Sequence, residues 1–226
     1  MSLIRSIMSG DVFTVVILVA ARAFVVFCCL PIHELAHGWM AYKLGDNTAK
    51  NMGRLSFNPI AHLDPIGTIM IFLFGIGYAR PVPINPLKFK DYRKGVALTA
   101  LAGPLSNLIM SFIFAFLSAG VSYIALKTYS TSVIFKAFTL FFSFAASVNI
   151  SLAVFNLLPI PPLDGSRILG AILPDRLYEK YFRYERIIMI VLIVLLFTGV
   201  LDGVLSVLVS FFYQIITFIP NLIFGF

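Results

Sequence analysis

The sequence predicts an all-α polytopic membrane protein with about five to six transmembrane helices and a small extended or hairpin insertion on the cytoplasmic or interfacial side. Of the 226 residues, 60% are hydrophobic and only 12% are charged, and the mean hydropathy is +0.97. A soluble domain typically carries about 25% charged residues. A chain of this length also has too much surface to hide such an apolar excess in one core. Soluble globular proteins and disordered proteins are therefore excluded.

A transmembrane helix needs about 20 consecutive apolar residues. Three segments are expected to form single spans: residues 12–43, 96–126 and 132–158. Residues 187–226 are long enough for two spans with a tight turn near Asp202. Residues 66–78 are apolar but too short to cross a bilayer, so a re-entrant or interfacial segment is expected there.

The first span has two unusual features. Its start resembles a signal peptide, but the apolar run continues past the small residues that would mark a cleavage site, so we expect a retained helix. The run is longer than the bilayer core is thick, and we expect it to tilt, to protrude or to kink at Pro31. Arg22 lies near mid-membrane, and the sequence shows no partner for it.

Basic residues predict the orientation. Residues 43–94 hold eight of the 17 lysines and arginines, and residues 159–186 hold five more, whereas the turn at 127–136 holds two. Lysine and arginine are retained on the cytoplasmic side of membranes. Both rich segments are therefore expected to be cytoplasmic, and five spans would then place the N-terminus outside and the C-terminus inside. The net charge of +7 reflects this orientation, and no nucleic-acid partner is expected.

No linker or internal repeat divides the chain. We therefore expect residues 1–226 to form a single integral-membrane domain. Its core would comprise residues 12–170, and its C-terminal spans would lie within residues 187–226. The oligomeric state is not encoded in any pattern of the sequence.

The densest group of ionisable residues in a predicted span is the pattern H-E-x-x-H at residues 33–37. Residues four apart share one face of a helix, so His33 and His37 can reach one metal ion. Glu34 lies about 100° around the helix, near enough to contact water on that ion. Ionisable groups are costly inside a membrane and mark functional sites. The pattern indicates a catalytic zinc ion.

Catalytic zinc normally takes a third protein ligand, and three residues are candidates. Cys29 lies on the same helical face but about 12 Å along the axis from His37, too far to share an ion. His62 lies in the first cytoplasmic loop. Asp164 follows a proline-rich stretch that ends a span, where extended backbone and a turn at Gly165 would present it on the cytoplasmic side. Asp164 is the best of the three.

These residues resemble the motifs of the site-2 proteases, intramembrane zinc metalloproteases. The matching elements are His33 to Gly38, Ala102 to Asn107, and Asn156 to Gly165, which follow one another in the family order. The resemblance implies that His33, His37 and Asp164 bind one Zn²⁺ ion and that Glu34 is the general base. It also implies that Asn107 and Asn156 support the site or bind substrate. The chain has room for neither the PDZ nor the CBS domain of many relatives, so a minimal form is expected.

The expected function is zinc-dependent hydrolysis of peptide bonds in or near transmembrane segments of other membrane proteins. The expected partners are such a substrate and the lipid bilayer, and the active site would lie toward the cytoplasmic side of the cell membrane. Residues 54–57 or 81–84 could offer an extended edge to an unwound substrate. Two alternatives remain open: a divalent-metal transporter that uses the same side chains as a transit site, and a membrane scaffold without proteolytic activity.

Overall fold

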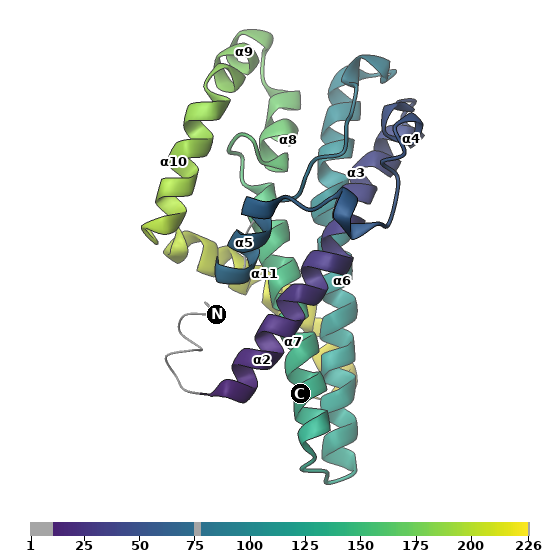
Figure 1. The fold of residues 1–226 in the computed structure, drawn as a ribbon, viewed down its shortest axis with the longest axis vertical. Coiled ribbons are helices and arrows are strands. Elements are labelled where there is room, and N and C mark those ends of the chain that lie inside the picture. The colour runs from purple at the N-terminus through teal and green to yellow at the C-terminus, as the bar shows by residue number, and fades with distance from the viewer. Residues whose placement is uncertain (1–10, 75–77, 226) are drawn as a thin grey trace.

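The chain folds into a bundle of helices joined by irregular loops (Figure 1). The computed structural model describes residues 11–74 and 78–225, and this part of the chain contains no β-strand. The α-helices are α2 (Val12–Phe24), α3 (Leu30–Lys43), α4 (Thr48–Asn51), α5 (Pro65–Phe74), α6 (Tyr92–Lys127), α7 (Val133–Leu157), α8 (Asp164–Ile172), α9 (Asp175–Arg183), α10 (Glu185–Phe197) and α11 (Asp202–Phe224). A π-helix, η1 (Val25–Cys29), joins α2 to α3, and two short 3₁₀-helices are η2 (Pro59–Ala61) and η3 (Pro86–Lys88).

The all-α polytopic membrane fold is confirmed. Within the described residues, four helices are long and apolar enough to cross a bilayer: Val12–Lys43, Tyr92–Lys127, Val133–Leu157 and Asp202–Phe224. This is fewer than the five to six expected. The difference arises at residues 187–226, because α10 has only 13 residues and rises about 20 Å, less than the thickness of the hydrocarbon core.

The first span is continuous but changes its winding at η1. Pro31 has no N–H group, so it cannot donate to the carbonyl of Phe27 four residues earlier, and its ring crowds that turn. The helix widens there: the N–H of Leu30 donates to the carbonyl of Val25, five residues back. The change of winding thus lies directly before Pro31 and the H-E-x-x-H segment.

Arg22 has a partner in the folded chain. Arg22 is 1% exposed, and its Nη1 donates to the backbone carbonyl of Phe72 near the end of α5. The last carbonyls of a helix have no partner within the helix, and none may stay unpaired at membrane depth. Arg22 thus joins the first span to α5, a ten-residue helix of the short kind expected at residues 66–78. Residues 75–77 of that stretch lie outside the described residues.

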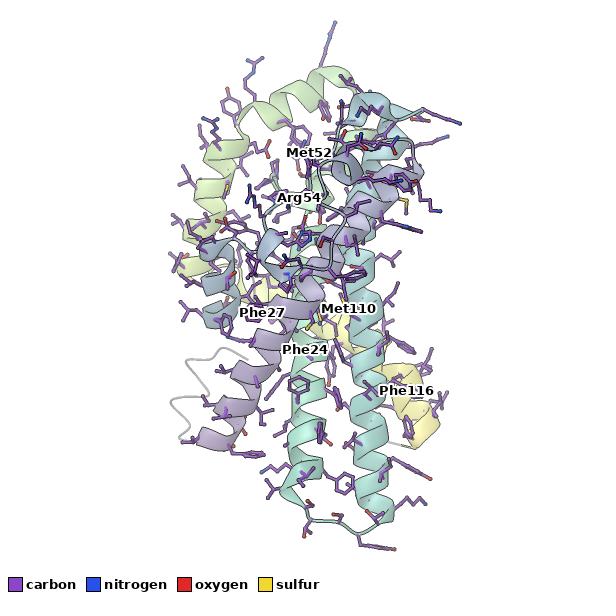
Figure 2. The ribbon with its side chains drawn as sticks, turned by 45° about the vertical axis from the view of Figure 1, so that its right-hand side comes forward. Phe24, Phe27, Met52, Arg54, Met110 and Phe116 are labelled. Atoms are coloured by element: carbon purple, nitrogen blue, oxygen red, sulfur yellow. The ribbon has the colours of Figure 1, made fainter. Side chains whose placement is uncertain are left out.

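Helix α6 is the central scaffold. It packs most extensively against α7, and both α3 and α8 lie against its N-terminal half (Figure 1). An apolar cluster joins the first span to α6 and α7; Figure 2 labels Phe24 of α2 and Met110 of α6, which belong to this contact region. Because α3 and α8 both pack against α6, His33 and Asp164 can meet although they are 131 positions apart in the sequence.

The proline-rich connection after α7 ends differently from expected. The helix stops at Leu157, as the prolines dictate, but Asp164 is the first residue of α8 and Gly165 is helical. The expected turn at Gly165 is therefore wrong. A side chain at Gly165 would lie 2.1 Å from the carbonyl oxygen of Leu157, so this glycine permits α8 to begin directly against the end of α7.

Residues 78–85 form a segment of irregular backbone that crosses the face of α3, and we call it the strap. Its far end is fixed by Asp46, which is fully buried. The Asp46 carboxylate accepts hydrogen bonds from the backbone N–H groups of Thr48 (2.9 Å) and Asn85 (2.6 Å), and it pairs with Lys88 at 3.6 Å. Burial acts to raise the pKa of Asp46, but these hydrogen bonds and Lys88 outweigh it and lower the pKa below its ordinary value.

We expect Asp46→Asn to destabilise the fold by about 1–3 kcal/mol at pH 7, because one acceptor becomes a donor that faces buried N–H groups. A lowered pKa means that the ionised form stabilises the native state above the pKa of the unfolded chain, and that this contribution is lost as the pH falls through the native pKa. The stability difference between wild type and Asp46→Asn should therefore shrink in acid.

Thermal unfolding of the detergent-solubilised protein at several pH values measures this difference. The matched control is Asp91→Asn. Asp91 is exposed and caps α6 by accepting from the N–H of Lys94, a position that asparagine fills equally well. An Asp46→Asn variant as stable as this control at pH 7 would contradict the prediction.

Candidate active site

Three side chains from two helices converge on one point. His33 and His37 extend from the same face of α3, and Asp164 opens α8. The Nε2 atoms of the two histidines are 3.0 Å apart, and Oδ2 of Asp164 lies 3.4 Å from Nε2 of His33 and 3.3 Å from Nε2 of His37. Within the described residues, they form a group of ligand atoms close enough to hold a metal ion.

The dimensions of this triangle fit zinc. A tetrahedral zinc ion with ligands at about 2.0–2.2 Å holds its ligand atoms about 3.3–3.6 Å apart, close to the three observed separations. Oδ2 of Asp164 is buried and has no hydrogen-bond partner, so the group contains an acceptor that only a cation or water could satisfy. Two imidazoles and one carboxylate also form a known donor set for catalytic zinc.

The carboxylate of Asp164 is held in its ionised form. Burial acts to raise its pKa, but the positive charge that His37 carries when it is protonated outweighs burial and lowers the pKa of Asp164. The N-terminal position of Asp164 in α8 also favours negative charge, because the helix dipole is positive there.

The orientation of His37 is fixed by backbone. Its Nδ1 lies 2.7 Å from the carbonyl oxygen of Thr99 on α6. A carbonyl can only accept a hydrogen bond, so Nδ1 carries a proton, and in the neutral imidazole Nε2 then presents its lone pair to the point shared with Asp164. This is the tautomer that binds a metal through Nε2.

Gly103 of α6 lies directly beneath the two imidazoles. A methyl group at this position would lie 2.2 Å from Nε2 of His37 and 2.7 Å from Cε1 of His33, closer than real contacts allow. Only glycine lets α3 approach α6 this closely, so the glycine of the Ala102–Asn107 motif makes room for the ligand atoms.

Glu34 faces the strap. Its carboxylate is 7% exposed, and Oε2 accepts a hydrogen bond of 3.0 Å from the N–H of Val82. The strap is held in place by Arg54, labelled in Figure 2, whose Nη2 donates to the carbonyls of Arg80 (3.1 Å) and Pro81 (3.2 Å). Gly38 admits the strap: an added methyl group would lie 3.0 Å from Val82. The strap thus orients the Glu34 carboxylate.

A cavity of about 700 Å³ adjoins the cluster of His33, Glu34, His37 and Asp164. Glu34, His33, His37 and Asp164 line it on one side, and α10 forms another wall through four apolar side chains: Met189, Leu192, Ile193 and Leu196. Around the polar group the cavity is mostly apolar. This combination is typical of a site that binds an apolar ligand and reacts at a few polar atoms.

The structure keeps His62 and Cys29 away from the three proposed ligands and places Asn156 and Asn107 near them. His62 is fully buried in the loop, where its Nε2 contacts the carbonyl of Ser56 at 2.8 Å, and Cys29 is buried in the apolar cluster of η1. Neither belongs to the group of ligand atoms. Asn156 lines the cavity, and its amide donates to the carbonyl of Leu152. Asn107 is fully buried and contacts Nδ1 of His33 at 3.1 Å.

Several residues that build the site were not anticipated from the sequence. Thr99 and Val82 act through backbone atoms, which no side-chain pattern reveals. Arg54 and Val82 lie in the two segments that were expected to offer an extended edge to a substrate, but their contacts with the strap carbonyls and with Glu34 were not expected. The only available signal was Pro81 and Pro83, which indicate a non-helical segment between two helices.

Comparison with known proteins agrees with this geometry. Residues 21–199 match the model of peptidase family M50. The YwhC protein of Bacillus subtilis (strain 168) is 45% identical over 170 residues, which cover 74% of this chain and 75% of YwhC. The Rip2 protein of Mycolicibacterium smegmatis is 26% identical over 205 residues, 88% of this chain and 74% of Rip2. The names of both class them as zinc metalloproteases.

No solved structure matches the chain. The family match covers most of the sequence and includes the H-E-x-x-H segment, the Gly103 region and Asp164. The chain therefore belongs to peptidase family M50, the site-2 protease family, and is a zinc metalloprotease of the membrane.

Proposed function

We propose that this protease hydrolyses peptide bonds in or near transmembrane segments of other membrane proteins. The observation that carries the proposal is the cavity that joins the group of His33, His37 and Asp164 to the apolar wall of α10. An apolar wall beside a hydrolytic site suits a substrate segment that arrives from lipid rather than from water.

In this proposal His33, His37 and Asp164 are the three protein ligands of one zinc ion. When bound, zinc acts as a Lewis acid that polarises a peptide carbonyl and acidifies water. His33 and His37 each bring a neutral nitrogen, and Asp164 brings a negative charge.

Glu34 is the general base. It takes a proton from the attacking water as the water oxygen bonds to the peptide carbon, and it delivers that proton to the leaving amine as the C–N bond breaks. Its hydrogen bond to the N–H of Val82 keeps one carboxylate oxygen turned toward the strap, which fixes the plane of the carboxylate. The position of Asn156 in the lining of the cavity supports a role in contacting substrate backbone.

A helical substrate must unwind locally, because its peptide groups are bonded to one another in lipid. The strap is irregular backbone and not a β-strand, and Pro81 and Pro83 give it no N–H donors at those two positions. Its carbonyls at Arg80 and Pro81 are already bonded to Arg54. The carbonyls of Arg80 and Pro81 and the N–H of Val82 are therefore not free to bind a substrate.

The site is proposed to face the cytoplasm. His37 lies six residues, or about 9 Å, before Lys43, where the first span meets the lysine- and arginine-rich connection. Residues 1–226 would act as one membrane domain, with residues 12–170 carrying the chemistry and residues 187–226 supplying the apolar wall.

We expect Glu34→Gln to retain zinc and to lose cleavage of a membrane-embedded substrate by at least about 100-fold, because glutamine keeps the shape but cannot accept the proton. Metal analysis and a cleavage assay in detergent measure the two properties. The matched control is Asp202→Asn, which removes a carboxylate at the start of α11, and it should keep both. Unchanged cleavage by Glu34→Gln would overturn the assignment.

Asp164→Asn should lower the zinc content of the purified protein well below about one ion per chain, because the neutral amide is a much weaker ligand than a carboxylate. Metal analysis after dialysis against a weak chelator provides the measurement. Full zinc retention would disqualify Asp164 as the third ligand.

Gly103→Ala should weaken zinc binding, because the added methyl group must push the imidazoles of His33 and His37 apart from α6. Gly120→Ala on the same helix is the control, since a methyl group there meets its nearest neighbour, Phe224, at an ordinary 3.4 Å. Equal zinc affinity in the two variants, measured by chelator competition, would show that the close approach at Gly103 is unimportant.

A divalent-metal transporter would use the same ligands for transit and would have no need of Glu34. Metal flux into liposomes, compared with proteolysis in detergent, separates the two functions. Flux without cleavage would favour the transporter, and cleavage without flux would favour the protease.

A further inference from the structure

Asn107 occupies an unusual position for a polar residue in a membrane span. It lies on α6 one turn after Gly103, is fully buried, and does not line the cavity. The nitrogen of its side-chain amide is placed 3.1 Å from Nδ1 of His33, while the amide oxygen is buried without a hydrogen-bond partner. Asn107 is therefore not positioned to touch a substrate in the cavity, and its side chain contacts the proposed ligand His33 instead.

The two histidines of the site must present the same kind of nitrogen. His37 donates from Nδ1 to the Thr99 carbonyl, which leaves the lone pair on Nε2. The Nε2 atom of His33 points to the same place, 3.4 Å from Oδ2 of Asp164. For His33 to act as a ligand there, its proton must also be on Nδ1, and Nδ1 then requires an acceptor.

The side chain in contact with His33 Nδ1 is Asn107, and an amide can meet this requirement. The two ends of a carboxamide have nearly the same shape, and a half-turn about the last side-chain bond exchanges them. The turn brings Oδ1, which lacks a donor in its present place, toward the Nδ1–H group of His33.

We propose that Asn107 is a positioning residue whose carboxamide oxygen accepts a hydrogen bond from Nδ1–H of His33 and so fixes the tautomer that presents Nε2 to zinc. This inference rests on the proposed ligand role of His33. It assigns to Asn107 the task that the Thr99 carbonyl performs for His37. A neutral His33 with its proton on Nε2 could not bind zinc through that atom.

Two substitutions test the orientation of the amide. Asn107→Leu keeps the approximate size of the side chain but removes the acceptor, and it should raise the Kd for zinc about 10–100-fold, as loss of such an outer partner does elsewhere. Asn107→Asp offers only acceptors and should bind zinc at least as tightly as wild type. The Kd is measured by competition with a chromophoric chelator in detergent, with no substrate present.

The matched control is Asn149→Leu. Asn149 is also fully buried in a span, but its amide donates to the Ala145 carbonyl of its own helix, so its loss should leave zinc affinity unchanged. If Asn107→Leu fails to fold, Asn107→Asp still decides. A carboxylate offers Nδ1–H of His33 the acceptor that the carboxamide oxygen is proposed to provide, so a folded Asn107→Asp variant should keep its zinc.

Wild-type affinity in Asn107→Leu, or loss of zinc in a folded Asn107→Asp, overturns the positioning role while leaving the protease assignment intact. Failure of the ligand assignment has a different signature: His33→Ala would then bind zinc as tightly as wild type. That result would overturn both.

Discussion

The close approach of α3 to α6 at Gly103 is the contact on which the site depends. It places two imidazoles against a helix that has no side chain there, and it lets the Thr99 carbonyl and Asn107 reach the Nδ1 atoms. The same part of α6 receives α8, which delivers Asp164. Polar groups at membrane depth are tolerated only when they are paired. Gly103 therefore allows the geometry of the ligand atoms and also the contacts of the two Nδ1 atoms, which lower the free-energy cost of placing these histidines at membrane depth.

Much of this arrangement was predictable because its signals are local and chemical. The spacing of His33 and His37, and the cost of ionisable groups in lipid, pointed to a metal site without any tertiary information. The proline-rich stretch correctly located the end of α7, and Asp164 lies beside His33 and His37 as expected. Four of the described helices have the length and hydropathy of a span, against the five to six expected, because hydropathy measures composition whereas the length of α10 depends on where the chain turns before Asp202.

What the sequence did not reveal is carried by backbone groups and by contacts across long separations. The partner of Arg22 is a carbonyl 50 residues away, and the partner of Glu34 is an N–H group 48 residues away. Every residue has such groups, so no residue type marks them. The turn expected at Gly165 failed for a related reason: the glycine serves close packing against Leu157, and packing leaves no trace in local turn chemistry.

The π-helix between α2 and α3 has a consequence for how the chain can vary. One residue more than an α-helix would hold is absorbed in Val25–Cys29, so the angular phase of α2 is offset from that of the segment carrying His33. Winding the same residues as a uniform α-helix would rotate α2, with Arg22, by about 100° relative to the zinc ligands, whereas deleting one residue from η1 would leave this angular relation nearly unchanged. The π-helix thus lets Arg22 face α5 while His33 and His37, on the same span, face α6.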